Sequence, residues 1–258
     1  MKHLFFVAMT ATLIFTIFPP CVGAMPKTEP ADGTTQADST RRVTRKAIKP
    51  KRKLPKITLT ADLGYGWRDA KINAELNAYE KAYYENLMLG LVVDASVHYY
   101  LNDYYGVGLI YAAHHANHSQ YSSLQYGDGS SETGIWKTNN AIRFIGPAFL
   151  LRMPVGRQKW LLEASIGLGY AGYSSKETFE NQSANMYGST LGGRLTLGAE
   201  YKVDAHWAIG ARLSEVVGAA TSRTKATDGY KKSLPASTNE RIGLGQFQLL
   251  AGVRYYFK

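Results

Sequence analysis

The feature that most constrains this sequence is an alternation of apolar with small or polar residues, repeated in eight segments. In residues 160–173, Trp160, Leu162 and Ile166 share one parity, whereas Glu163 lies on the other. Because successive side chains of a β-strand point to opposite faces, each such segment predicts a strand with one apolar face. The sequence therefore predicts an all-β fold in which every strand has one apolar face.

The connections between the predicted strands alternate in length. Three are tight, near residues 101–103, 155–159 and 204–206, and four are long and polar, over residues 68–85, 119–136, 175–188 and 219–239. An antiparallel up-and-down barrel places all short turns at one rim and all long loops at the other, with both ends of an even-stranded chain on the short-turn side. The predicted strands cover residues 57–67, 87–99, 104–115, 137–153, 160–173, 191–202, 207–214 and 246–257.

One predicted strand, 137–153, breaks the alternation. Ile142 and Phe144 share a parity, but Phe149 and Leu151 lie on the other. Proline and glycine inside a strand often mark a β-bulge, which shifts the parity by one residue. We therefore predict a bulge at Gly146-Pro147.

The N-terminal residues 1–24 have the pattern of a signal peptide. Lys2 precedes an apolar run over residues 4–18, and Val22-Gly23-Ala24 resembles a cleavage site. The run is short for a membrane-spanning helix. Cys21 lies within this segment and is the only cysteine, so we expect no disulfide in the mature chain.

Residues 25–55 form a basic segment that we predict to be a disordered periplasmic tail. Between Met25 and Lys56 the sequence has ten Lys or Arg and three Asp or Glu, so most of the net charge of +10 lies here. The remaining chain, residues 57–258, is almost balanced, which argues against a nucleic-acid partner. We expect the tail to contact anionic lipid or the cell wall. Its clustered basic residues are Arg41, Arg42, Arg45, Lys46, Lys49, Lys51, Arg52 and Lys53.

Alternation alone does not tell whether the apolar faces point into or out of the barrel. A lipocalin-like carrier has them inside, whereas a transmembrane barrel has them outside. The other face is rich in Gly, Ser, Asp and Arg, and aromatic residues gather near strand ends on the apolar face, both of which favour a transmembrane barrel. These aromatic residues are Tyr65, Trp67, Tyr99, Tyr105, Trp160, Tyr170, Tyr201, Trp207, Tyr255 and Phe257.

Residues 56–258 resemble the small eight-stranded outer-membrane β-barrel proteins, the OmpX-like and OmpA-barrel-like group. The resemblance rests on the architecture and on the terminal strand LLAGVRYYF, although here Lys258 follows the aromatic Phe257 that ends the family pattern. It implies a cell outer-membrane location, contact with outer-membrane lipid, and recognition of the last strand by the barrel assembly machinery.

Charged residues on the polar parity are predicted to face the barrel interior. Eight strands leave an interior that side chains just fill, so we expect paired charges forming a plug rather than an open pore. The expected neighbours are Arg143 with Glu163, Glu163 with Arg194, Glu200 with Arg212, and Arg254 with Asp62. The predicted lumenal charges are Asp62, Asp94, Arg143, Glu163, Arg194, Glu200, Arg212 and Arg254.

The most reactive cluster is HHANHS, residues 114–119, with Glu132 in the following loop. Ser119 lies on the opposite parity from His114 and His118, so the sequence does not predict a catalytic triad. We expect no enzymatic activity, no metal site and no cofactor. Lipid modification by these residues is an alternative.

We predict that this barrel acts in surface interaction or envelope integrity through its long loops. Seven tyrosines in those loops suit a binding surface. The other alternative is a narrow transporter that admits small hydrophobic molecules through a lateral gap at Gly146-Pro147. The loop tyrosines are Tyr79, Tyr83, Tyr84, Tyr121, Tyr126, Tyr187 and Tyr230.

Overall fold

The barrel lies within residues 51–258 of the computed structural model. The predicted signal peptide and the eight basic tail residues lie outside the described part of the chain, as does Tyr126. The structure describes residues 54–70, 72, 76–125, 129–155, 158–180, 182–220, 222–227, 230–235 and 242–257.

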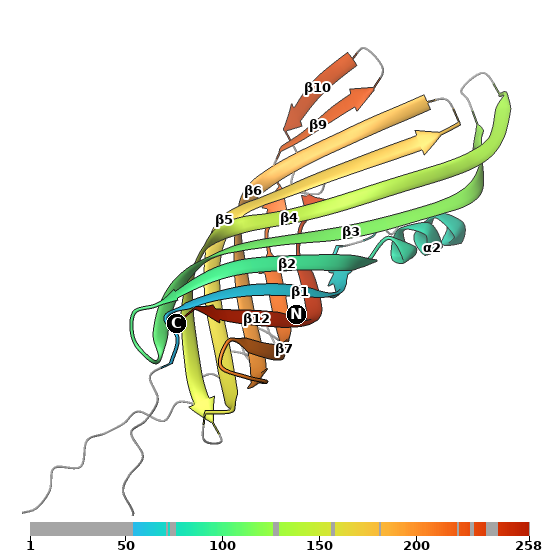
Figure 1. Ribbon diagram of the computed structural model, residues 1–258. Coiled ribbons are helices and arrows are strands. Elements are labelled where there is room, and N and C mark those ends of the chain that lie inside the picture. The colour runs from blue at the N-terminus through green and yellow to red at the C-terminus, as the bar shows by residue number, and fades with distance from the viewer. Residues whose placement is uncertain are drawn as a thin grey trace, which may run out of the picture. The chain divides into compact units, whose positions relative to one another are not determined.

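Eight long antiparallel strands form a closed ring (Figure 1). Each pairs with its neighbours in chain order, and β12 pairs with β1 from Ile57 opposite Phe257 to Arg68 opposite Gln246. The predicted eight-stranded up-and-down barrel is therefore confirmed. The strands are β1 (Ile57–Arg68), β2 (Leu89–Tyr100), β3 (Tyr105–Gln125), β4 (Ser131–Val155), β5 (Trp160–Phe179), β6 (Gln182–Lys202), β7 (Trp207–Val217) and β12 (Gln246–Phe257).

The three predicted tight turns lie together at one end of the barrel, which we call the short-turn end. Two of them are fixed by a side-chain oxygen that accepts backbone N–H groups. Oδ1 of Asn102 accepts from Tyr104 and Tyr105, each at 2.8 Å, and Oδ1 of Asp204 accepts from His206 at 2.6 Å and Trp207 at 2.8 Å. Such Asx turns are a favourable local way to reverse the chain.

The apolar faces of the strands point outward. Leu89 is 47% exposed and Ile166 is 60% exposed, whereas Asp94 is 1% and Arg194 is 3% exposed. Apolar residues thus cover the outer surface, and polar residues fill the interior. This arrangement is the reverse of a lipocalin and excludes that alternative.

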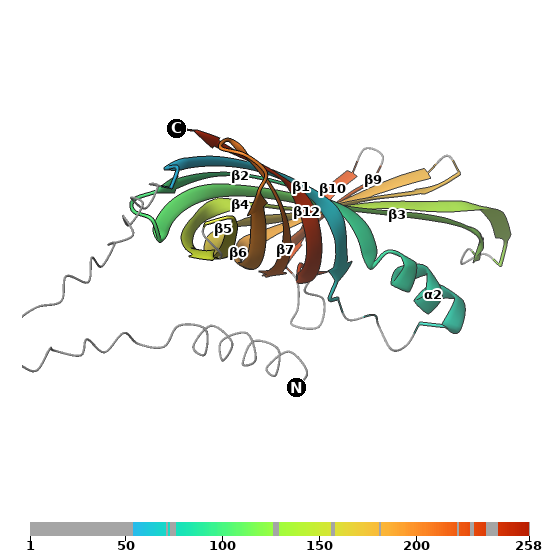
Figure 2. The ribbon, with the colours of Figure 1, turned by 60° about the horizontal axis from the view of Figure 1, so that its bottom comes forward.

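The hairpins at the opposite end, which we call the hairpin end, are longer than the sequence suggested. β3 and β4 stay paired up to Gln125 opposite Ser131, and β5 and β6 up to Phe179 opposite Gln182. The predicted loops 119–136 and 175–188 are therefore mostly strand. Figures 1 and 2 show both hairpins projecting beyond β1, β2, β7 and β12.

Short strands and one helix occupy the other two connections at the hairpin end. β9 (Ser222–Thr227) extends the sheet along β6 and pairs with β10 (Tyr230–Pro235). β8 (Ala219–Ala220) pairs with β11 (Ile242–Gly243). Helix α2 (Ala78–Asn86) interrupts the predicted loop 68–85.

Helix α2 begins at a capping box that the sequence carries but that our prediction did not use. Oδ1 of Asn77 accepts the Glu80 backbone N–H at 2.8 Å, and the Glu80 carboxylate accepts the Asn77 N–H at 3.1 Å. These two bonds satisfy backbone donors that a helix start otherwise leaves free. Among the described helices, none has the length and apolar character needed to cross a membrane.

The predicted bulge at Gly146-Pro147 is wrong. β4 keeps one register against β3 from Leu151 to Ser131, and its register against β5 is the same on both sides of this dipeptide. Ile142 and Phe144 face the interior instead of lipid, so no parity shift is needed. The change in apolar parity reflects an apolar layer inside the barrel.

Candidate functional site

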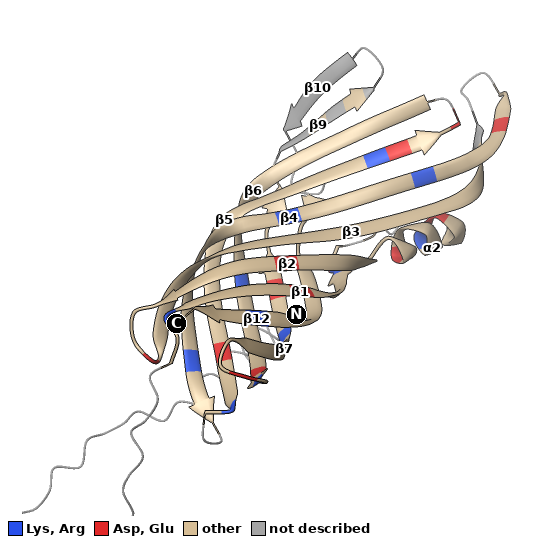
Figure 3. Cartoon of the chain, in the orientation of Figure 1, with Lys and Arg blue, Asp and Glu red and all other residues tan. Residues whose placement is uncertain are grey.

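Seven of the eight predicted lumenal charges are buried inside the barrel. They come from β1, β2, β5, β6, β7 and β12, and Figure 3 shows acidic and basic positions interspersed on the barrel strands. Their parity on each strand places them on the inner face, where the surrounding wall excludes bulk water. The seven are Asp62, Asp94, Glu163, Arg194, Glu200, Arg212 and Arg254.

Arg212 is the centre of this cluster because its guanidinium is shared by four carboxylates. Nη1 lies 3.1 Å from Oδ2 of Asp62 and 3.8 Å from Oδ1 of Asp94. Nη2 lies 3.1 Å from Oε1 of Glu163 and 3.7 Å from Oε1 of Glu200. One cation thus joins charges from β1, β2, β5 and β6 across the lumen.

Arg254 and Arg194 complete the cluster on either side. Arg254 is 0% exposed, pairs with Asp62, and donates from Nε to Glu200 at 3.0 Å. Nη1 of Arg194 lies 2.5 Å from Oδ2 of Asp94. Two of the predicted neighbour pairs, Glu200 with Arg212 and Arg254 with Asp62, are within ion-pair distance, whereas Glu163 pairs with Arg212 instead of Arg194.

Arg143 lies on the outer face of β4, so its predicted lumenal position is wrong. Because β4 has no bulge, Arg143 shares the outward parity of Ile145 and Phe149. The interior arginine of β4 is Arg152, which our prediction missed. The outward parity of Phe149, continued along the strand, would have identified it.

Arg152 closes the short-turn end of the interior. Its guanidinium lies 3.6 Å from the centre of the Tyr100 ring, and its Nη1 donates to the Pro55 carbonyl at 2.9 Å. Leu54, assigned to the tail from sequence, is only 6% exposed and packs with Leu161, Ala208 and Tyr256. The chain entering β1 therefore helps to cap the barrel.

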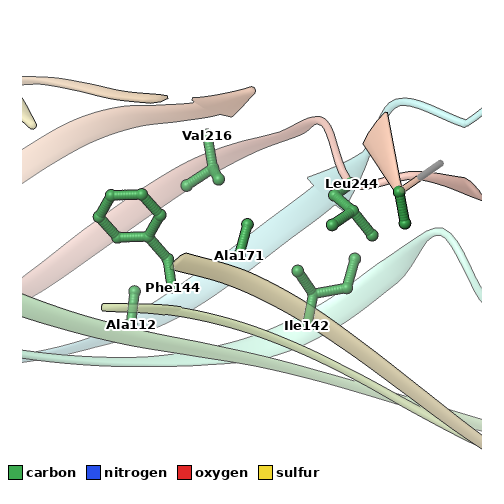
Figure 4. Close-up of a cluster of buried hydrophobic side chains, with 7 residues drawn as sticks. Ala112, Ile142, Phe144, Ala171, Val216 and Leu244 are labelled. Carbon is green, nitrogen blue, oxygen red and sulfur yellow. The ribbon is translucent and has the colours of Figure 1, made fainter. Parts of the chain in front are cut away.

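An apolar layer lies between the charge cluster and the hairpin end. Figure 4 shows Phe144 from β4 and Val216 from β7 directed toward one another across the lumen, with Ala171 beside them. Ile142 and Leu244 extend the layer toward the hairpin end, and all five side chains are buried. The described interior side chains thus form two chemically different layers.

A cavity of about 680 Å³ lies on the side of this apolar layer that faces the hairpin end. Tyr173 and Ile242 pack on the layer and also line the cavity. Nε and Nη2 of Arg68 donate to the Gly243 carbonyl at 3.2 and 3.0 Å and fix one wall. The other lining residues include Asp69, Ile72, Leu76, Tyr84, Leu87, Met88, Thr138, Asn140, Glu177 and Met186.

Tyr83 holds α2 against the inner face of the β3–β4 hairpin. Its ring centre lies 5.1 Å from that of His118 and 5.6 Å from that of Trp136, and its hydroxyl donates to Oγ1 of Thr138 at 2.6 Å. Burial raises the pKa of Tyr83, which keeps this hydroxyl protonated as a donor. The helix therefore forms part of the cavity wall through Tyr84 and Leu87.

The reactive cluster of the sequence is not assembled into a catalytic arrangement in the described residues. His114 is buried and its Nε2 lies 3.1 Å from the Gly66 carbonyl, while His118 contacts Tyr83. Ser119 points outward, and Glu132 lies at the tip of the hairpin. Within the described ranges, no three metal-binding side chains converge on one point.

Aromatic residues border the outer apolar surface. At the short-turn end, Trp160 packs on Tyr201 at 5.0 Å between ring centres, and Trp207 on Tyr255 at 4.9 Å. Tyr170 lies at the opposite border. A closed β-ring with an outward apolar belt between aromatic borders and a polar interior is a transmembrane β-barrel.

The comparison with protein families agrees with this class. The chain belongs to the outer membrane protein beta-barrel domain family, whose family model matches residues 55–257. The barrel therefore lies in the cell outer membrane and contacts outer-membrane lipid. Among curated proteins, none matches the sequence.

The chain is similar to solved outer-membrane protein structures at low sequence identity. A major outer membrane protein from Thermus thermophilus is 12% identical, with a TM-score of 0.50, over 78% of this chain and 99% of that one. Neisserial surface protein A is 12% identical, with a TM-score of 0.43, over 78% and 97%. Ail, the attachment invasion locus protein of Yersinia pestis, is 13% identical, with a TM-score of 0.39, over 77% and 99%.

Proposed function

We propose that this barrel is closed to solutes and acts at the cell surface through the structures at its hairpin end. The observation that carries this proposal is the cluster around Arg212, in which one buried guanidinium meets four carboxylates. Paired charges of this kind fill the narrow lumen of an eight-stranded barrel and leave no water-filled path. The apolar layer around Phe144 adds a second barrier.

The projecting hairpins are the part of the protein that best suits contact with a partner. Outer-membrane barrels place their short turns in the periplasm and their long connections outside the cell. The β3–β4 and β5–β6 hairpins, β9–β10 and α2 therefore form an extracellular surface. Exposed tyrosines such as Tyr79, Tyr121 and Tyr187 give that surface large, rigid contact groups.

The hairpin surface is tested by trimming it without disturbing the barrel. Ser119 and Lys137 are register partners, so an Asn-Gly turn can join them in place of residues 120–136. We expect the trimmed protein to keep its heat-modifiable gel mobility. Cells that carry it should attach to protein-coated wells much less than cells with the full chain, or become sensitive to SDS.

The closed lumen is tested separately in planar bilayers. Purified full-length protein should show no stepwise ion conductance, because the charge cluster leaves no continuous path. Steady conductance at neutral pH would contradict the closed barrel. If trimming leaves both attachment and SDS resistance at the full-chain level, the proposed surface role is wrong.

A role in uptake of small hydrophobic molecules is the second candidate, favoured by the cavity of about 680 Å³ and its apolar floor. The predicted exit, a lateral gap at Gly146-Pro147, finds no support. A Cβ at Gly146 would overlap the Leu168 carbonyl, and one at Gly169 would overlap the Ile145 carbonyl, so β4 and β5 are in close contact there. Accumulation of octane in proteoliposomes above that in empty liposomes would favour this candidate.

A further inference from the structure

Arg143 occupies an unusual position on the outer surface of the barrel. The pairing of β3 to β6 aligns Ala113, Arg143, Gly172 and Ser189 in one row across four strands. The next row toward the short-turn end contains Tyr111, Ile145, Tyr170 and Leu191, which are all exposed and apolar or aromatic. Arg143 therefore lies one row beyond the outer apolar surface, on the side of the hairpin end.

The row on the other side of Arg143 is more polar. It aligns His115, Ala141, Ser174 and Tyr187. The outer surface thus changes from apolar to polar at Arg143, on the border marked by Tyr111 and Tyr170. Because aromatic residues of outer-membrane barrels lie at the membrane interfaces, this row is at the depth of the lipid headgroups of the outer leaflet.

A hollow of about 480 Å³ lies beside Arg143 on this outer surface. Hydroxyl groups of Tyr170, Ser174, Tyr187, Ser189 and Thr224 are among the groups that line it, and none of its ten lining residues is acidic. Gly172, directly opposite Arg143, has no side chain, and the ring and hydroxyl group of Tyr170 lie over it at the hollow. One guanidinium and several hydroxyl donors around an open space are the groups that bind a phosphate.

Arg143 has no partner of its own in the described part of the chain, where the other side chains form no ion pair or hydrogen bond with its guanidinium. The interior arginines Arg194, Arg212 and Arg254 are all paired with carboxylates. A cation next to hydrocarbon is costly unless an anion compensates it.

We propose that the hollow beside Arg143 binds the phosphorylated headgroup of an outer-leaflet lipid. The guanidinium pairs with the phosphate in bidentate fashion, and the surrounding hydroxyl groups donate further hydrogen bonds. The acyl chains of the same lipid then lie along the apolar belt below, over Ile145 and Leu191. The site thus binds the phosphate group and contacts the acyl chains of the same lipid.

The test measures lipid binding to the folded full-length protein in detergent by native mass spectrometry. The probe is bisphosphorylated hexa-acyl lipid A, compared with the same lipid after removal of its phosphates. We expect Arg143→Gln to bind the phosphorylated lipid about tenfold more weakly than the unchanged protein. The phosphate-free lipid should bind the unchanged protein as weakly as the phosphorylated lipid binds Arg143→Gln.

Lys137→Gln is the matched control, because Lys137 is an exposed cation on the same face of β4 that does not line the hollow. It should change binding by less than about twofold, and heat-modifiable mobility should show that both variants fold. Equal binding by Arg143→Gln and the unchanged protein, or an equal loss in both variants, would overturn the proposal. Displacement of the lipid by equimolar inorganic phosphate would reject the lipid as the source of the phosphate.

Discussion

Replacing Arg212 with Met is expected to lower the free energy of unfolding of the barrel by about 3–5 kcal/mol, the usual cost of removing one partner from a buried ion pair. The variant leaves Glu163 without an arginine among the described residues, whereas Asp62 and Glu200 keep Arg254 and Asp94 keeps Arg194. Urea titration of the detergent-folded protein, followed by its heat-modifiable mobility, measures the change. An unchanged midpoint would contradict the structural role of the cluster.

Two further variants separate this effect from a general effect of losing an arginine. Arg143→Met makes the same substitution on the outer surface, where no described side chain pairs with the guanidinium. In detergent free of lipid A, it should change the free energy of unfolding by no more than about 0.5 kcal/mol. Adding Glu163→Gln to Arg212→Met should restore part of the loss, because one uncompensated carboxylate is removed.

Replacing Gly252 with Val is expected to prevent most of the protein molecules from closing into a barrel. Gly252 of β12 lies opposite Asp62 of β1, and a Cβ at this position would overlap the carbonyl oxygen of Ala61. The clash is with backbone, which cannot rotate away, so the cost should reach or exceed the upper end of the ~1–3 kcal/mol typical of overpacking. The folded, fast-migrating gel band should be lost.

Gly167→Ala is the control for this variant. Gly167 is another inward-facing glycine, but a methyl carbon added there would have the Pro147 carbonyl oxygen as its nearest neighbour, at 3.2 Å. A shift of a few tenths of an ångström accommodates that contact, so the folded band should persist. Normal folding of Gly252→Val would contradict the close pairing of β1 with β12 at this position.

Which residues of a strand face lipid could be predicted from the sequence wherever large apolar residues recur at every second position without interruption. In β5 and β6, Ile166 and Leu197 lie on uniformly apolar parities, and Glu163 and Arg194 on the other. In β4, Ile142 and Phe144 belong to an interior apolar layer, which residue type alone does not distinguish from a lipid-facing one. The misplaced Arg143 follows from this ambiguity, whereas Arg152 could have been placed inside from the outward parity of Phe149.

The structures beyond the membrane were harder to predict for a different reason. Residues 119–125 and 131–136 form strands beyond the lipid-facing surface, so no contrast between a lipid-facing and an interior parity marks them. Helix α2 had a detectable signal, the capping pair Asn77 and Glu80. Ion pairs across the lumen, such as Arg194 with Asp94, depend on the stagger of the closed barrel, which a single sequence does not specify.

Spin labels on β5 measure directly which face of this strand contacts lipid. Ser165 and Ile166 are adjacent, but Ser165 is buried in the lumen and Ile166 faces outward. Single-cysteine versions of the chain without residues 1–24 can carry a nitroxide at either position after reconstitution into lipid vesicles. We predict that the nitroxide at Ile166 is relaxed strongly by oxygen and weakly by a water-soluble nickel complex, whereas the nitroxide at Ser165 is relaxed weakly by both. Strong relaxation of the Ile166 label by the nickel complex would contradict the outward, lipid-facing belt.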